Sequence, residues 1–262
     1  MSGQSYAMTD SATMLRRNLR HALRYPALTI GAVGTPIVIL LLFVGVLGDT
    51  LGAGLGRAAA GGGYVDYVAP GIILMTVASG CMATAVSVCV DMTGGIVNRF
   101  RTMAISRGSL LTGHVVGSVI QTLISTALVI GVAVLLGFRP TAGLNEWGAA
   151  IGLLALLAFA LTWLAVLIGL VSKTPESASN TPLLIALLPF ISSAFVPTDS
   201  MPAGVRWFAE NQPFTPIIET TRGLLLGAPI GSSAMIAVAW CIGIALAGYL
   251  GARAVSDRPR AS

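Results

Sequence analysis

The chain has 262 residues, of which 55% are hydrophobic and only 10% are charged, and its mean hydropathy is +0.86. Soluble domains carry about 25% charged residues, so this composition cannot cover a water-facing surface and predicts that a lipid bilayer surrounds most of the chain. The net charge is +5, but the basic residues lie beside apolar runs, which indicates a membrane surface and argues against nucleic acid as a partner. Three cysteines, Cys81, Cys89 and Cys241, lie within apolar runs at spacings that fit no zinc or redox motif.

The first patterned element is residues 11–26, SATMLRRNLRHALRYP. Apolar residues recur in it at helical spacing and arginines fill the opposite face, which predicts an amphipathic helix in the cytoplasmic interface of the membrane. We therefore expect residues 1–26 to form a cytoplasmic tail with this helix, whose ordinary role is to anchor the chain and set its topology.

Apolar runs that could cross a bilayer follow. A spanning helix needs about 20 mainly apolar residues, and the sequence predicts six such helices within a transmembrane domain of residues 27–251. The fold class is thus predicted to be an all-α membrane protein. The six predicted spans are 27–47, 65–90, 113–136, 147–171, 180–197 and 231–251. The fifth is short and contains Pro182 and Pro189, which predict a kink.

The distribution of basic residues predicts the orientation of these spans. With a cytoplasmic N-terminus, eleven of the fifteen Lys and Arg residues fall in cytoplasmic segments: Arg16, Arg17, Arg20, Arg24, Arg99, Arg101, Arg107, Lys173, Arg253, Arg258 and Arg260. The remaining four fall outside: Arg57, Arg139, Arg206 and Arg222. By the positive-inside rule, we expect both termini, including the tail 252–262, in the cytoplasm. Arginine far outnumbers lysine, which favours a GC-rich bacterial genome and hence a multi-pass protein of a bacterial plasma membrane.

Residues 52–63, GAGLGRAAAGGG, are glycine-rich but do not form a nucleotide-binding loop. Arg57 occupies the last glycine position of a GxGxxG pattern, and the GK[ST] ending of a phosphate loop is missing. We interpret the segment as a flexible external loop. The only histidines are His21 and His114, and no acidic cluster accompanies them, so the sequence indicates neither a metal site nor a catalytic triad. We expect no enzyme activity on this chain.

A second amphipathic helix is predicted in the cytoplasmic loop 91–110, DMTGGIVNRFRTMAISRGSL, between the second and third spans. Its apolar residues form one helical stripe: Ile96, Val97, Phe100, Met103 and Ala104. Arg99 and Arg101 lie off this stripe. Such a helix either lies in the membrane interface or docks into a groove on a soluble partner.

The segment before the last predicted span, residues 192–227, carries four prolines and two short amphipathic pieces. Ser200 and Thr215 are candidate N-terminal caps of two short helices, and Gly227 is a candidate C-terminal residue of the second. The second piece would reach about 18 Å, too short for a hydrocarbon core of about 30 Å. We expect a re-entrant external helical hairpin, which either lies flat on the membrane or dips into it and returns. The predicted apolar stripe of the second piece is Ile217, Ile218, Thr221, Leu224 and Leu225.

Glu219 and Arg222 lie three residues apart in this second piece and share one helical face. Two interpretations remain open. They form an ordinary exposed pair that contributes little to stability, or they are partners below the lipid headgroups, where a lone charge would be costly.

Two motifs resemble those of a known family. The cytoplasmic DMTGGIVNRFRTMAISRG and the external segment 192–227 are similar to segments of type-two ABC transporter permeases, most closely the subgroup of daunorubicin-resistance-like ABC exporter membrane subunits. The matching cytoplasmic residues are Asp91, Gly95, Arg99, Phe100, Arg101, Ile105, Ser106, Arg107 and Gly108. The matching external residues are Ala194, Phe195, Val196, Pro197, Met201, Pro202, Phe208, Ala209, Asn211, Pro213, Arg222, Leu225 and Gly227.

The resemblance implies a permease subunit of an ATP-driven exporter that moves a hydrophobic small molecule, such as a drug, an antibiotic or a lipid-like compound, out of the cell. Two permease subunits, as a homodimer or a heterodimer, would pair in the lipid bilayer. Two copies of a separate cytoplasmic ATP-binding subunit would bind ATP and Mg, so no cofactor is expected on this chain. Residues 91–108 would couple to that subunit. The external lid would include Pro197, Pro202, Phe208, Asn211, Pro213, Glu219, Arg222 and Gly227.

Other functions fit the sequence less well. A permease for a polysaccharide or a lipid-linked carrier is the alternative on the same scaffold. A membrane-embedded lipid-modifying enzyme would need histidine, cysteine or acidic groups facing a cavity, and a secondary carrier would need ionisable groups inside its spans. The predicted spans have almost none. A structural membrane protein would not need the external signature.

Overall fold

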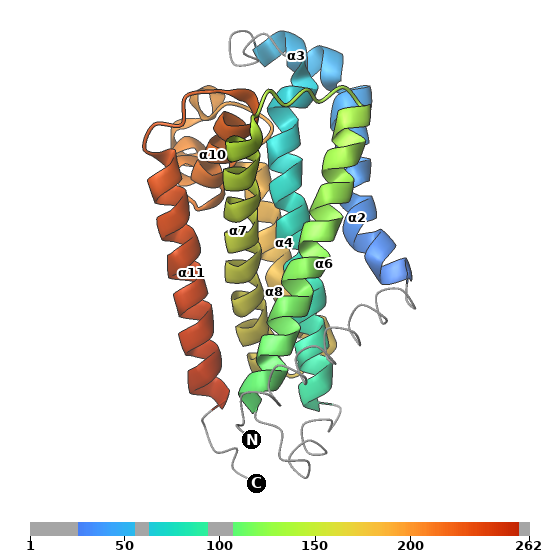
Figure 1. The fold of residues 1–262 in the computed structure, drawn as a ribbon, viewed down its shortest axis with the longest axis vertical. Helices are drawn as coiled ribbons and strands as arrows, with labels where there is room; N and C mark the ends of the chain where they lie inside the picture. Colours follow the sequence, from blue (N-terminus) through green and yellow to red (C-terminus); the bar gives the residue numbers. More distant parts are fainter. Residues whose placement is uncertain (1–25, 56–62, 94–106, 257–262) are drawn as a thin grey trace.

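The computed structural model describes residues 26–55, 63–93 and 107–256, and the regular structure within these ranges is entirely helical. The prediction of an all-α protein is confirmed for this part of the chain. Figure 1 shows the long helices side by side in one bundle, with a group of short helices at one end. Nearly all of the predicted interfacial helix 11–26 and most of the loop 52–63 lie outside the described residues.

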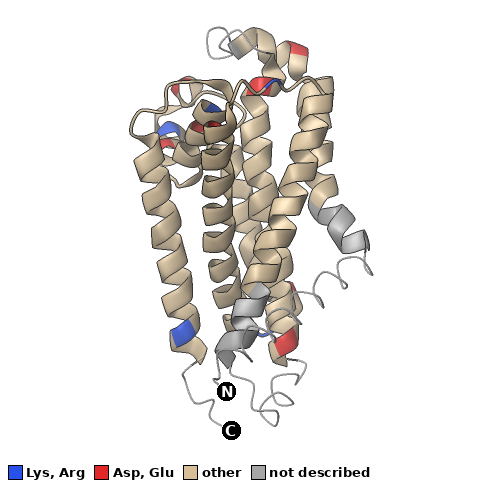
Figure 2. Ribbon diagram, viewed as in Figure 1, with Lys and Arg blue, Asp and Glu red and all other residues tan. Residues whose placement is uncertain are grey.

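Four helices are long and apolar enough to cross a membrane: α4 (Tyr64–Thr93), α6 (Arg107–Leu135), α7 (Leu144–Val171) and α11 (Ser233–Ser256). In α6 the candidate span is Val115–Leu135. The four helices correspond to the second, third, fourth and sixth predicted spans. Each contains a long stretch without a charged residue, and Figure 2 accordingly shows the charged residues at the two ends of the bundle. The middle of the bundle can therefore face hydrocarbon without burying a charge.

The chain bends at the end of the first predicted span, 27–47. α2 (Pro26–Leu41) passes into a π-helical turn, η1 (Leu42–Val46), and α3 (Gly48–Leu55) then leaves at an angle. The two arms of this bend differ in direction by 71°, and Figure 1 shows α3 lying across the end of the bundle. The described chain thus has four candidate spans, or five if the bent pair counts as one.

The fifth predicted span, 180–197, is not one continuous helix. The chain instead forms α8 (Pro175–Leu187), followed by a short 3-10 helix, η3 (Leu188–Ile191). Pro189 explains the change, because it lacks the backbone N–H that would continue the α-helical hydrogen bonds. The N–H of Leu188 already bonds to the carbonyl of Ile185 in the tighter 3-10 pattern. The predicted kink is present, but neither helix qualifies as a span by itself, so a layout of six spans is not established.

The segment after η3 forms the short 3-10 helix η4 (Thr198–Ser200), α9 (Ala203–Asn211) and α10 (Phe214–Leu226). The two short helices predicted from the sequence are therefore present. α10 packs against α4, α7 and α11, at the end of the bundle where α4 begins and α11 begins (Figure 1). We refer to this as the α10 end of the bundle.

The core is built around α4, which packs against α2, α6, α7 and α8. Its side chains are fully buried over several turns, including Ile72 and Leu74. Glycine allows helices to approach closely elsewhere: a methyl group at Gly248 of α11 would lie 2.7 Å from the backbone of α7 at Leu164. Close backbone contacts at small residues are the ordinary way in which membrane helices associate.

Candidate functional site

The predicted coupling residues lie mostly in the part of the loop that the structure does not describe. Gly95, Arg99, Phe100, Arg101, Ile105 and Ser106 lie outside the described residues. Asp91 lies near the C-terminal end of α4, and Arg107 and Gly108 begin α6. These two helix ends lie at the same end of the bundle, opposite α10 (Figure 1). The helix predicted between them stays a prediction.

Basic residues predicted to lie on opposite sides of the membrane lie at opposite ends of the bundle. The Arg139 backbone N–H donates to a carboxylate oxygen of Asp66 at 2.9 Å, in the first turn of α4. Arg222 also contacts the first turn of α4. Arg253 lies in the last turn of α11, at the other end. Which of these two ends faces the cytoplasm stays a prediction from the positive-inside rule.

The chain segment 192–195, which we call the outer turn, lies between η3 and η4 and is fully buried. The Ser192 hydroxyl donates to the Pro189 carbonyl and accepts from the Ala194 N–H, so the turn satisfies part of its own backbone. The Phe195 ring stacks on Phe43 of η1 at 4.3 Å between centroids and on Phe190 of η3 at 5.2 Å. The outer turn therefore joins the bent first helix to the end of α8.

Gln212 holds the end of α8 to the start of α10. It is 4% exposed, and its side-chain nitrogen donates to the carbonyls of Leu188 and Ile191 at 3.4 and 3.2 Å. Its side-chain oxygen accepts from the Phe214 N–H at 3.3 Å. Carbonyls at the end of a helix have no partner within that helix, and Gln212 supplies one for two of them. No sequence motif marked Gln212 as a functional residue, although an amide directly before Pro213, between two predicted short helices, was an available signal.

Arg222 connects three parts of the α10 end. Its Nη2 atom donates to the carbonyl of Tyr67 in α4 at 3.1 Å and to the carbonyl of Ser193 in the outer turn at 2.7 Å. Its guanidinium carbon lies 4.1 Å from the centroid of the Tyr67 ring, in a cation–π contact. Burial lowers the pKa of Arg222, and the nearby charge of Glu219 acts in the opposite direction.

The predicted pairing of Glu219 with Arg222 is wrong as a direct contact. The ion pairs within 4 Å among the described residues do not include these two side chains. Glu219 instead accepts a hydrogen bond from the Ser233 hydroxyl at the start of α11, at 3.3 Å. Arg222 contacts backbone carbonyls of two neighbouring elements, α4 and the outer turn, in place of Glu219.

The predicted end and apolar stripe of α10 are correct, whereas the predicted N-terminal caps of α9 and α10 are not. Gly227 ends the helix in the left-handed conformation, with φ of 73°, as predicted. The predicted apolar stripe is confirmed as buried or partly buried. The predicted caps are wrong: helices α9 and α10 follow Pro202 and Pro213, neither of which has a side-chain capping hydrogen bond. The Thr215 hydroxyl lies inside α10 and donates to the Ala209 carbonyl, and the Ser200 hydroxyl donates to the Pro197 carbonyl.

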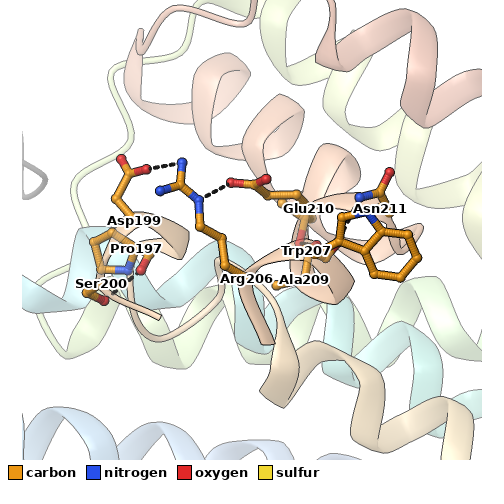
Figure 3. Close-up of polar contacts among 9 residues, drawn as sticks. Pro197, Asp199, Ser200, Arg206, Trp207, Ala209, Glu210 and Asn211 are labelled. Carbon is orange, nitrogen blue, oxygen red and sulfur yellow. Dashed lines mark hydrogen bonds and ion pairs between the residues drawn. The ribbon is translucent and has the colours of Figure 1, made fainter. Parts of the chain in front are cut away.

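α9 has a different character from α10, because it carries exposed side chains over most of its length. Arg206 forms ion pairs with Asp199 at 2.7 Å and with Glu210 at 2.8 Å, as Figure 3 shows. Glu210, through its hydrogen bond and charge, and Asp199 raise the pKa of Arg206. The Asn211 side chain donates to the Trp207 carbonyl (Figure 3). The Phe208 ring, predicted as part of the lid, is 40% exposed.

One face of α8 is covered by no other described helix. In the first half of α8 this face carries polar side chains, including the exposed Ser177, Asn180 and Thr181. In its second half it carries Leu184 and Leu187, which are 69% and 46% exposed. The polar half begins at the end of the bundle opposite α10, because the carbonyl of Ser172 beside α8 accepts from Cys89 near the end of α4.

Within the described ranges, no group of three or more His, Cys, Asp or Glu side chains is arranged to hold a metal ion. The three cysteines are free thiols buried in the bundle.

Comparison with known proteins identifies the family. The model of the ABC-2 type transporter family matches residues 10–226. This chain belongs to the ABC-2 type transporter family. A daunorubicin resistance ABC transporter permease protein, DrrB1 of Streptomyces coeruleorubidus, is 26% identical over 222 residues, which cover 84% of this chain and 76% of that protein. A probable doxorubicin resistance ABC transporter permease protein, DrrC of Mycobacterium tuberculosis, is 26% identical over 215 residues, with 82% and 76% covered.

The predicted family resemblance is confirmed by this match. As an ABC-2 type transporter chain, it is the multi-pass membrane permease of a bacterial ABC exporter and not an enzyme, and ATP hydrolysis takes place on a separate ATP-binding subunit.

Proposed function

We propose that this permease exports a hydrophobic small molecule of the kind named in its relatives, a drug or antibiotic with a large apolar surface. The observation that carries this proposal is the similarity to daunorubicin and doxorubicin resistance permeases over more than four-fifths of the chain. The composition supports it, because the described helices offer apolar surface and hydroxyl groups and few charges.

We infer that the working unit contains two such permease subunits, six spans in each, and two ATP-binding subunits. The bent α2–α3 pair and the broken α8–η3 segment would each count as one span, and both termini would lie in the cytoplasm. The basic residues support this orientation. The position of α10 also supports it, because α10 lies at the end of the bundle opposite the last turn of α4 and the first turn of α6 (Figure 1). Broken helices of this kind are common where a transporter binds or passes its substrate.

Coupling is assigned to the loop between α4 and α6. Residues 91–108 would dock on the ATP-binding subunit, with Phe100 as the apolar anchor and Arg99 and Arg101 beside it. The amphipathic pattern of the loop supports this role. Movement of the loop would be transmitted along α4 and α6, which begin or end there.

The substrate pathway is assigned to the uncovered face of α8. The Ser177 and Thr181 hydroxyls donate to the carbonyls of Thr174 and Ser177. The exposed Asn180 amide has no such partner among the described residues and is unfavourable against lipid, because hydrocarbon offers it no hydrogen bond. A polar face at this depth is favourable only against water, a polar part of the substrate, or another subunit. The α10 end, from Pro197 to Gly227, would then be the external lid of the pathway.

The experiment is ATP-dependent transport into inverted membrane vesicles that contain this permease and its co-expressed ATP-binding subunit. We expect uptake of the fluorescent compound doxorubicin with ATP and none with a non-hydrolysable ATP analogue. Vesicles with the permease alone serve as the control. Uptake of a labelled lipid-linked sugar without uptake of doxorubicin would contradict the proposed substrate class. ATP hydrolysis by the purified permease chain alone would contradict the division of work between the two subunits.

A further inference from the structure

Two side chains fasten α10 to the outer end of α8, one near each end of α10. Gln212, just before α10, donates to the carbonyls of Leu188 and Ile191 in η3. Arg222, in the last turns of α10, donates to the carbonyl of Ser193 at 2.7 Å. Because η3 and the outer turn continue directly from α8, these contacts join α10, the outer turn and the end of α8 into one connected unit.

This unit rests on α4 at two neighbouring places. At the first, Gly71 of α4 faces Ala194 of the outer turn so closely that a methyl group on Gly71 would lie 2.5 Å from the Ala194 side chain. At the second, Arg222 contacts both the carbonyl and the ring of Tyr67. The contact between Gly71 and Ala194 is close apolar packing. The contact between Arg222 and Tyr67 is a hydrogen bond together with a cation–π interaction.

The polar contact is incompletely satisfied. The Nε atom of Arg222 and the hydroxyl oxygen of Ser193 are buried and have no hydrogen-bond partner among the described residues. A buried donor without a partner costs free energy. No carboxylate lies within 4 Å of Arg222 in the part of the chain that the structure describes, and Glu219 is engaged with Ser233. Arg222 therefore holds this contact although one of its buried donors has no partner. A contact that is only partly satisfied is suited to opening and closing.

We propose that Arg222 is the latch of the external lid, and that the lid opens by separating the contact of Arg222 and the outer turn from Tyr67 and Gly71 of α4. The inference rests on the exporter function proposed above and identifies the residue that keeps the exit closed. α8 extends from the end of the bundle near the cytoplasmic loops to the outer turn, so a shift of α8 reaches Ser193 directly. Arg222 is a positioning residue: it holds the lid and is not assigned a contact with the substrate.

Ser193 offers a direct reporter of the latch. Its hydroxyl has no partner and its side chain is 3% exposed, so Ser193→Cys places a thiol of similar size at a site that is covered while the lid is closed. Its backbone carbonyl, which accepts from Arg222, remains. A membrane-impermeant maleimide added to intact cells should react slowly with Ser193→Cys alone.

The test adds substitutions to this reporter. Arg222→Gln should raise the labelling rate about tenfold, the order expected when charged hydrogen bonds are lost. Arg206→Gln is the matched control, because Arg206 lies on α9 in the same region and its ion pairs within the described residues are with Asp199 and Glu210 alone. This variant should leave the rate unchanged. An equal labelling rate in the reporter and in Arg222→Gln would overturn the latch.

A second pair of variants covers the case in which Arg222→Gln does not accumulate in the membrane. Tyr67→Phe removes the hydroxyl but keeps the ring under Arg222, whereas Tyr67→Leu removes the ring and should label faster than Tyr67→Phe. Equal rates in these two variants would also overturn the proposal. Peptide mass spectrometry distinguishes opening of the lid from general unfolding, because the native Cys81, Cys89 and Cys241 are buried and must stay unlabelled. Labelling of these three in Arg222→Gln would contradict a local latch.

Labelling requires neither ATP nor substrate, so it tests the latch separately from the exporter function. A normal labelling response in vesicles that show no ATP-dependent transport would count against the proposed function and leave the latch standing. Conversely, transport of doxorubicin with no labelling response to Arg222→Gln would reject the latch and leave the exporter function standing.

Discussion

α7 and α8 follow each other in the chain and satisfy their backbone hydrogen bonds differently. α7 is an uninterrupted α-helix of 28 residues, whereas α8 ends after 13 residues and passes into a 3-10 helix of four. α7 contains no proline, and α8 and η3 contain Pro182 and Pro189. The uninterrupted helix satisfies its own backbone. The broken one depends on side chains from elsewhere, namely Gln212 and Arg222, for its outer end.

A break in an apolar helix creates a binding site for another part of the same chain. Freed carbonyls in a nonpolar environment need a donor, and a donor that arrives from another element also fixes that element in place. α7 contributes rigidity through close backbone contacts with α11. The end of α8 contributes a joint that can be opened by breaking a few hydrogen bonds.

The largest effect is expected where α11 packs on α7. A methyl group at Gly248 would lie 2.7 Å from backbone atoms of Trp163 and Leu164, which cannot move aside easily. Gly248→Ala should lower the free energy of unfolding by about 3 kcal/mol. Gly243→Ala on the same helix is the control, because nothing lies within 4 Å of the added methyl group; it should be neutral or gain up to about 1 kcal/mol from helix propensity. Thermal unfolding of the purified protein in detergent measures both, and equal losses would contradict the close contact.

Removal of the Gln212 amide should have the next largest effect. Gln212→Leu leaves the carbonyls of Leu188 and Ile191 without their side-chain donor and should lower the free energy of unfolding by about 2 kcal/mol. Gln121→Leu on α6 is the control: this glutamine is partly buried and makes no side-chain hydrogen bond within the described ranges. The same unfolding measurement applies. If the two leucine variants were equally stable, Gln212 would not be what holds the broken helix.

The uncovered face of α8 should affect transport and leave stability nearly unchanged. Asn180→Leu replaces an exposed amide with an apolar side chain, and exposed substitutions of this kind change stability by about 0.5 kcal/mol or less. ATP-dependent uptake of doxorubicin should fall if Asn180 lines the pathway. Ile151→Leu on the exposed face of α7 is the control and should transport normally. Normal transport by Asn180→Leu would remove this face from the pathway.

The smallest effect is expected at the ion pairs of α9. The Asp199 side chain is 82% exposed, and those of Arg206 and Glu210 are 44% and 43% exposed, so water and salt screen these pairs. Arg206→Gln should leave the melting temperature unchanged within error, in contrast to Gln212→Leu on the neighbouring turn. Glu210→Gln should behave in the same way. A marked loss of stability in either variant would mean that α9, and not α10, carries the folding energy of this end.

Much of the fold follows from sequence patterns whose physical basis is local. The four long helices correspond to four apolar runs, Gly227 ends α10 as predicted, and the kink expected from Pro189 is present. The candidate site was predicted less well. The capping roles of Ser200 and Thr215 were wrong because prolines occupy the residues before α9 and α10. The roles assigned to the lid and the coupling residues stay predictions.

The sequence by itself determined that this chain resides in a bilayer, where its four long apolar helices lie, and which family it resembles. These properties depend on composition, helical periodicity and short motifs, all of which can be read along one chain. Only the tertiary structure decided the partners of Arg222 and Gln212. Sequence spacing predicted Glu219 as the partner of Arg222, because spacing identifies only side chains that are neighbours on the same helix. The folded chain brings the carbonyls of Tyr67 and Ser193 to the guanidinium from positions 155 and 29 residues away, and backbone carbonyls occur at every residue, so no side-chain pattern marks which of them will serve.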